Sequence, residues 1–498
     1  MSGALLVLGT SSGSGKSTVV TGLCRWLHRR GVSVAPFKGQ NMSLNSFVTA
    51  SGGEMGRAQV VQAQAAGVEP DVLMNPVLLK PGTDTTSQLI VLGRAVGDLD
   101  AASGWAKKGD LLEVVVESYR ELRRRYDVVF CEGAGSPAEI NLRASDIVNL
   151  GFARAANVPA VLVGDIDRGG VFASLIGTVA VLSPEDQQYV RGFVINKFRG
   201  SKALLAGGLE RLFELTGRAS LGVLPFVRGL ELDAEDAVDF SAWLDPGAPN
   251  GLDVLTVGVI ALPRASNVTD VDPLVSEPGV SVRALYRPEQ MVDCDVVILP
   301  GTRATVKDLA WVRERGFAEA LARRAAAGRV VFGICGGYQM LGATIDDDVE
   351  SASGHIAGLG LLPVRTIFQR EKILRQSWRN AGPAGPVGGY EIHHGVVHVD
   401  GGEPLFADEG CVRGSVYGTT WHGLFENDAW RRLFLSAVAT SAGKEFRVAP
   451  DTDFAARRER RIDDVADLLE EHLSLDELEA LLDDWPRPPL ARVGLTLG

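Results

Sequence analysis

The chain has 498 residues, of which 46% are hydrophobic and 22% are charged, so it is an ordinary globular protein with room for two or three domains. Its net charge of −12 argues against a surface that coats nucleic acid. No stretch approaches the ~20 continuous apolar residues that cross a membrane, and the apolar start at residues 4–8 lacks the basic lead and cleavage site of a signal peptide. We therefore expect a cytoplasmic protein with neither a membrane nor a nucleic acid partner.

The first half of the chain alternates apolar strand-like runs with amphipathic helical stretches. The predicted strands are Leu5–Gly9, Val32–Lys38, Val128–Cys131, Ala160–Gly164, Gly192–Asn196 and Leu221–Leu224. The predicted helices are Ser17–Arg30, Gly56–Ala66, Leu111–Tyr126 and Val171–Leu182. Such alternation is typical of βαβ units in a mostly parallel sheet that is covered on both faces. We assign residues 1–240 to this first α/β domain.

A second α/β domain is expected over residues 252–440, after a linker at Asp245–Gly251 that is dense in turn formers. Its predicted elements are strands at Leu252–Leu262, Val296–Leu299 and Gly389–Val399 and one helix near Val306–Ala327. Residues 441–498 are strongly charged, and 463–471 and 475–482 are predicted to form two acidic amphipathic helices. We interpret this helical tail as a packed cap with a solvated face rather than as a docking site for a partner.

A phosphate-binding loop follows the first strand, at Gly9–Thr18. Its glycines let the backbone wrap an anion, and the helix that begins there supplies N–H groups and a favourable dipole. We expect Lys16 to reach the terminal phosphates of ATP and Ser17 to ligate Mg²⁺. The first glycine of the usual pattern falls on Thr10, so the loop is longer than usual. The predicted ATP-binding residues of this loop are Gly13, Gly15, Lys16, Ser17 and Thr18.

Polar residues end three further strands of the same domain, where ligands bind in open α/β sheets. Glu132 is predicted to hold the metal, although an ordinary loop glutamate is the alternative. Asn196 is a candidate for reading the adenine edge of ATP. Asp165 and Asp167 are weaker candidates for metal or substrate contact.

Cys335 is the clearest candidate nucleophile, because it stands between an apolar strand and a helix in the run Val330–Leu341. Glycines on both sides permit the sharp turn that exposes such a side chain, and the helix N-terminus favours the thiolate. Five cysteines without a CxxC pair indicate neither a disulfide framework nor a zinc site.

The candidate base for this thiolate is His422, which ends an extended run ahead of a helix. The backbone N–H groups of Gly301 and Gly336 are candidates for the oxyanion hole. A further histidine group, His393, His394 and His398, invites a metal interpretation, but no Cys or paired carboxylate completes it.

The Cys335 elbow together with His422 resembles a class I glutamine amidotransferase domain, and the first half resembles dethiobiotin synthetase-like P-loop amidoligases. Longer motifs narrow the resemblance to the cobyric acid synthase family over nearly the whole chain before the tail. These motifs are Pro36–Ser46, Glu54–Gln59, Asn75–Pro81, Glu132–Leu142, Asp165–Phe172 and Gly389–Gly395.

The resemblance implies a glutamine-hydrolysing carbon–nitrogen ligase that needs ATP and Mg²⁺. It implies amidation of the b, d, e and g carboxylates of adenosylcobyrinic acid a,c-diamide to adenosylcobyric acid, through acyl phosphates and ammonia from glutamine. Asp146, which follows the Glu132 loop, is either a contact to the metal or the corrinoid or the aspartate that starts a helix.

One position departs from the amidotransferase pattern, in which a glutamate stands two residues after the histidine. Here that position is Leu424, and Glu426 comes two residues too late, so the acid partner of His422 stays open and a Cys–His dyad is one alternative. The rival interpretations are a cobyrinic acid a,c-diamide synthase, a CTP synthase, whose His-Pro-Glu run is missing here, and a P-loop ATPase switch with a degenerate amidase domain.

Overall fold

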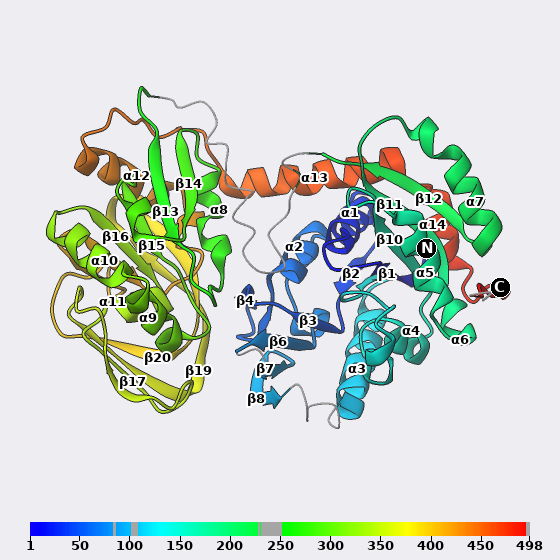
Figure 1. Ribbon diagram of the computed structural model, residues 1–498, viewed down its shortest axis with the longest axis horizontal. Coiled ribbons are helices and arrows are strands. Elements are labelled where there is room, and N and C mark those ends of the chain that lie inside the picture. The colour runs from blue at the N-terminus through cyan, green and yellow to red at the C-terminus, as the bar shows by residue number, and fades with distance from the viewer. Residues whose placement is uncertain (83–85, 101–107, 228–229, 231–250, 495–498) are drawn as a thin grey trace.

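Apolar strands in both halves of the chain assemble into two separate six-stranded sheets, each flanked by helices (Figure 1). The computed structural model describes residues 1–498 except 83–85, 101–107, 228–229, 231–250 and 495–498. The predicted linker lies outside the described residues apart from Gly251. Two α/β domains with a helical C-terminal region confirm the predicted fold class.

The sheet of the first half is parallel throughout. Its strands, in spatial order, are β12 (Ala219–Pro225), β11 (Val190–Phe198), β10 (Ala160–Asp165), β1 (Gly3–Gly9), β9 (Val128–Glu132) and β2 (Val34–Phe37). The helices include α1 (Lys16–Arg29), α2 (Arg57–Ala65), α3 (Lys108–Arg125), α4 (Leu150–Ala156), α5 (Val171–Ala180), α6 (Pro184–Gln187) and α7 (Ala206–Thr216). Side chains on both faces of β1 are buried, as expected for a parallel sheet between two helical layers. The six predicted strands and four predicted helices are all present, with ends shifted by a few residues.

A small sheet that the sequence analysis did not predict projects from the first half toward the second (Figure 1). It contains β3 (Gln40–Met42), β6 (Val77–Pro81), β7 (Thr86–Val91) and β8 (Arg94–Asp100), beside a hairpin of β4 (Ser46–Val48) and β5 (Glu54–Gly56). The strands of the hairpin are three residues long, too short for an alternating pattern to be recognised. The hairpin contacts the second half through strand β20 (Pro386–Val399).

The second half is built on the strands β14 (Val280–Leu285), β13 (Leu255–Ile260), β15 (Val296–Leu299), β16 (Val330–Ile334), β22 (Val416–Thr419) and β21 (Cys411–Arg413). Its helices include α8 (Asp272–Val275), α11 (Gly336–Leu341) and α12 (Asp428–Ala442). A second sheet contains β18 (Gly354–Ala357), β17 (Thr344–Asp347), β19 (Val364–Asn380) and β20. The prediction of one helix over 306–327 was wrong: α9 (Thr305–Glu314) and α10 (Phe317–Ala326) are separated by Gly316. Its left-handed φ of 78° ends the first helix, which an apolar pattern alone does not reveal.

The C-terminal helices return to the first half, because α13 (Phe454–His472) extends from the second half and packs along α1 (Figure 1). Leu469 of α13 lies against Gly22, where an added Cβ would come within 2.7 Å of the leucine. Arg29 on α1 pairs with Asp463 at 2.9 Å. Helix α14 (Leu475–Asp483) packs against β1, so the acidic tail is part of the core. No described helix is long and apolar enough to cross a membrane.

Candidate active sites

Cys335 stands on a strained turn between β16 and α11. Its φ of 48° and ψ of −109° are rare for a residue with a Cβ, and such strain is characteristic of functional positions. Only glycine fits beside it, since a Cβ at Gly337 would lie 1.9 Å from the Leu299 carbonyl oxygen and one at Gly333 would lie 2.8 Å from Tyr338. The local sequence therefore dictates an elbow with the sulfur at its apex.

The structure brings His422 to Cys335 and adds an acid that the sequence analysis missed. His422 Nδ1 lies 2.7 Å from Asp270 Oδ2, and the Gly423 N–H donates to Asp270 Oδ1 at 2.7 Å. All three side chains of the Cys–His–Asp set are buried. The acid comes from the short helix η6 (Val268–Val271), which follows β13. Asp270 and His422 are 152 positions apart, so sequence spacing does not link them. The only sequence signal for Asp270 was that it is an acidic residue that follows a predicted strand.

The charges in this set favour a thiolate and an imidazolium. Burial by itself lowers the pKa of His422, but the attraction of Asp270 and Cys335 raises the pKa to about 10. Burial likewise raises the pKa of the Cys335 thiol, yet His422 outweighs it and the pKa lies below its usual value. The site therefore favours a thiolate nucleophile paired with its own proton donor.

The two predicted oxyanion residues lie close to other residues of the Cys335 site. A Cβ at Gly301 would come within 3.0 Å of the His422 Cε1 atom, and one at Gly336 would come within 3.1 Å of the Thr302 nitrogen. Gly336 opens α11, so its N–H has no carbonyl partner inside that helix. An oxyanion hole needs backbone donors near the nucleophile, and the role of Gly301 and Gly336 stays a prediction.

The small pocket that contains Cys335 and His422 is lined by both halves of the chain. Lys80 and Gln88 come from the small sheet of the first half. His393 and His394 also line it, and each is hydrogen-bonded to a backbone oxygen, at 2.7 Å and 3.1 Å respectively. Among the described residues no group of three or more His, Cys, Asp or Glu side chains is placed to hold a metal ion.

The phosphate loop wraps the N-terminus of α1. Gly13 and Gly15 have φ values of 70° and 98°, which only glycine adopts without strain. Lys16 Nζ donates to the Ser11 carbonyl at 3.0 Å and to the Gly135 carbonyl at 3.2 Å. Thr18 lies in the first turn of the helix. Lys16 therefore connects the phosphate loop to the segment that follows Glu132.

Glu132 and Ser17, the predicted metal ligands, are adjacent: the Ser17 hydroxyl donates to Glu132 Oε1 at 2.9 Å. Burial raises the pKa of Glu132, but Lys38 at 2.9 Å outweighs it, so the pKa lies below its usual value. Gln62 donates to the other carboxylate oxygen at 2.5 Å. One charged carboxylate and one hydroxyl beside a phosphate loop fit Mg²⁺, which is commonly bound by one or two carboxylates, water and substrate phosphates.

Three other predicted residues occupy supporting positions. Asn196 Nδ2 donates to the Ser14 carbonyl at 2.9 Å, so its amide braces the phosphate loop. Asp146 accepts backbone N–H groups at the start of α4 at 2.8–3.0 Å, which is the role of a helix-starting aspartate. Asp165 is paired with Lys197 at 2.9 Å. Adenine contact by Asn196 and substrate contact by Asp146 stay predictions.

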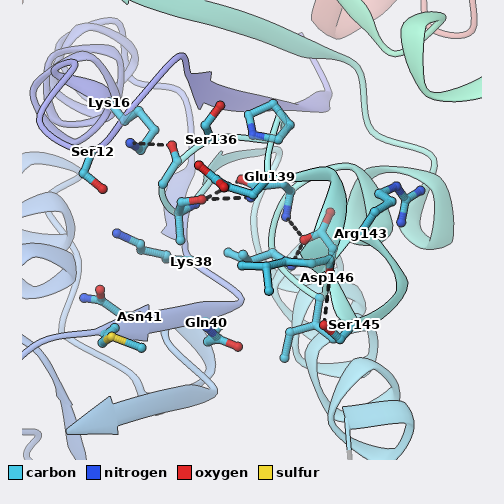
Figure 2. Close-up of a pocket in the computed structure, with 18 of the residues that line it drawn as sticks. Ser12, Lys16, Lys38, Gln40, Asn41, Ser136, Glu139, Arg143, Ser145 and Asp146 are labelled. Atoms are coloured by element: carbon cyan, nitrogen blue, oxygen red, sulfur yellow. Dashed lines mark hydrogen bonds between the residues drawn. The ribbon is translucent and has the colours of Figure 1, made fainter. Parts of the chain in front are cut away.

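A second pocket opens over the phosphate loop (Figure 2). Figure 2 shows Lys16, Lys38 and Asn41 on one side and Glu139, Arg143 and Asp146 on the other. Its walls come from the phosphate loop, strand β3 and the segment after β9. The pocket therefore combines an anion-binding site at the phosphate loop with an opposite wall that carries both acidic and basic side chains.

Comparisons with known proteins cover both halves. Residues 5–238 match the CobQ/CobB/MinD/ParA nucleotide binding domain, and residues 256–430 match the CobB/CobQ-like glutamine amidotransferase domain. The chain is 57% identical to a cobyric acid synthase of Streptomyces avermitilis, with 97% of each chain covered. It is 56% identical to that of Streptomyces coelicolor, with 97% of each covered, and 55% identical to that of Rhodococcus jostii, with 99% and 98% covered.

Proposed function

The chain belongs to the cobyric acid synthase family, and we propose that it makes adenosylcobyric acid by four amidations of adenosylcobyrinic acid a,c-diamide, at the b, d, e and g carboxylates. Each amidation consumes one glutamine and one ATP and passes through an acyl phosphate. The observation that carries the proposal is the presence, in one chain, of a Cys335–His422–Asp270 set and a phosphate loop with Lys16 and Glu132.

Glutamine hydrolysis begins when the Cys335 thiolate attacks the side-chain carbonyl carbon of glutamine. The oxygen that becomes negative is stabilised by the backbone N–H groups of Gly301 and Gly336. His422 then gives its proton to the leaving nitrogen, and ammonia departs from a thioester at Cys335. Asp270 holds the imidazole in the tautomer that serves this transfer, because it accepts the Nδ1–H. A water molecule activated by His422 hydrolyses the thioester and frees glutamate.

At the phosphate loop, a substrate carboxylate attacks the γ-phosphorus of ATP and ADP leaves. Lys16 and the loop N–H groups stabilise the charge on the transferred group. Mg²⁺, when held by Ser17 and Glu132, supplies further neutralisation of phosphate charge. An acyl phosphate is required because a bare carboxylate resists attack by ammonia. Ammonia then displaces inorganic phosphate and leaves the amide.

The test is mass spectrometry of the product made by purified protein with ATP, Mg²⁺, glutamine and candidate corrinoids. The proposal predicts a mass change of four carboxyl-to-amide conversions on the a,c-diamide, each matched by one glutamate released. Conversion of the a and c carboxylates of cobyrinic acid instead would identify a cobyrinic acid a,c-diamide synthase. A protein that releases no glutamate and ignores every corrinoid would be a nucleotide switch.

A further inference from the structure

Two half-exposed apolar side chains line the phosphate pocket from different walls. Met42 of β3 is 49% exposed, and Leu142 of the segment after β9 is 40% exposed. Single exposed apolar side chains are common on protein surfaces, but a pair of them over one pocket is typical of a ligand-binding rim. The pair therefore indicates a ligand that brings apolar surface to this pocket.

Packing does not account for either side chain. Leu142 belongs to the 3-10 helix η3 (Ile140–Ser145), which has no buried side chain. Polar contacts hold this helix instead, because Arg143 donates to both carboxylate oxygens of Asp186 at 2.7 and 2.8 Å. Met42 ends β3, whose backbone is fixed by pairing with β6. Both backbones are thus held in place without these two side chains, which remain available to a ligand.

The cavity is too small for a whole corrinoid. Its volume is about 310 Å³, at the lower end of the roughly 300–1,000 Å³ that accommodates drug-sized ligands. A corrinoid, with its macrocycle, its side chains and its axial ligand, is larger than such a ligand. Lys16 and Lys38 are the nearly buried cations of the cavity, at 5% and 2% exposure. One anionic side chain of the corrinoid therefore fits inside, while the macrocycle stays at the rim.

The adenine base of ATP is expected on the other side of the sheet centre. Asn196, its predicted contact, belongs to β11, which β10 separates from β1. Met42 and Leu142 come from segments that follow β2 and β9, and these strands lie on the opposite side of β1. The apolar pair is therefore placed for the second substrate rather than for the base.

We propose that Met42 and Leu142 form an apolar rest for the corrin macrocycle, which lies against them while one carboxylate arm at a time reaches the phosphate loop. This inference rests on the proposed function, in which four arms of one macrocycle visit a single phosphate loop. The polar groups that flank an arm differ from one arm to the next, whereas ring carbons and methyl groups border all of them. Apolar contact is non-directional, so the same two side chains serve all four orientations.

The experiment measures initial rates of the full-length protein with ATP, Mg²⁺, glutamine and adenosylcobyrinic acid a,c-diamide, and mass spectrometry resolves products with one to four new amides. Met42→Ser and Leu142→Ser are each expected to raise KM for the corrinoid about tenfold, because each removes an apolar side chain that the macrocycle covers. The kcat and the KM for ATP should stay within about threefold of wild type. At low corrinoid concentration all four amidations should slow by a similar factor.

Two kinds of control accompany these variants. Met42→Leu and Leu142→Met keep apolar surface, and their KM for the corrinoid is expected within about twofold of wild type. Leu215→Ser makes the same change as Leu142→Ser at a similarly exposed leucine, 45% exposed on α7, and should match wild type in every constant. Thermal unfolding checks that each variant is folded, and if Leu142→Ser is not, Met42→Ser decides.

Four results would overturn the apolar rest. An unchanged corrinoid KM in a folded Ser variant would show that its side chain carries no contact, and a rise confined to the KM for ATP would assign the pair to the nucleotide. Slowing of one amidation alone would tie the pair to a single orientation. A rise in the conservative variants as large as in the Ser variants would show that shape, not apolar surface, matters. A wild-type protein that amidates no corrinoid would instead refute the proposed function.

Discussion

Replacing Asp270 by asparagine tests whether the acid that approaches from η6 completes the glutaminase site. Two donors point at this carboxylate, His422 Nδ1–H and Gly423 N–H, each at 2.7 Å and each to a different oxygen. An asparagine has one acceptor oxygen, so one of the two donors must face an NH₂ group. The imidazole can avoid this clash by adopting the other neutral tautomer. Nε2 then carries the hydrogen and can no longer accept the proton of Cys335.

The expected loss is large, because the wrong tautomer removes the base rather than weakening it. We expect kcat for glutamine hydrolysis to fall roughly 10³- to 10⁴-fold, or about 4–5.5 kcal/mol of activation free energy. The alkaline limb of the pH profile should also move. Burial lowers the pKa of His422 and Asp270 is the main opposing influence that raises it to about 10, so without the carboxylate the imidazolium loses its proton at lower pH. Residual activity should therefore decline earlier as pH rises.

The assay is glutamate release across pH, with amidation from ammonium chloride as the measure of an intact synthetase. The matched control is Glu426→Gln, since Glu426 is the acid nearest to His422 in sequence but pairs with Arg57 at 2.8 Å and Arg458 at 3.2 Å instead. It should keep the alkaline limb of wild type. An Asp270→Asn protein with glutaminase activity within threefold of wild type and an unmoved alkaline limb would refute the triad.

Three other substitutions separate the remaining roles. Cys335→Ala should abolish glutamine-dependent amidation but spare amidation from ammonium chloride; failure of both would place Cys335 in the synthetase chemistry or in folding. Lys16→Ala should eliminate amidation with either nitrogen source, measured as ADP and amide formation, and retained turnover would contradict the phosphate site. Asn267→Gly keeps the left-handed φ of 53° but removes the acceptor of the buried Ser46 N–H at 2.8 Å. It should destabilise the protein by about 1–3 kcal/mol in thermal or denaturant unfolding, and unchanged stability would show that this contact between the halves contributes little.

The contacts between the halves explain why the glutaminase pocket belongs to both. Asn267, which accepts the Ser46 N–H, is the residue before η6, and the Val268 N–H in turn donates to Asn45 Oδ1 at 3.3 Å. The helix that carries Asp270 is thus hydrogen-bonded to the β4–β5 hairpin and to the residue before it.

The sequence by itself was enough to predict the two α/β domains, the phosphate loop and the elbow at Cys335. These features are local: strand and helix periodicity, glycines where φ is positive, and a lysine and serine at a helix start are all written within about ten to twenty residues. The break at Gly316 was missed because an apolar pattern continues across a helix end. The hairpin at residues 46–56 was missed because its strands are only three residues long.

Only the tertiary structure decided which distant groups meet. Asp270 reaches His422 across 152 residues, and Lys372 reaches Glu54 across 318. Gln59 and Gln62 are ordinary helix residues in the sequence, and only the tertiary structure buries them and pairs them with Asn41 and Glu132. Spacing along a chain encodes local conformation, whereas the pairing of charges and hydrogen bonds between elements depends on how whole sheets pack, which no short segment specifies.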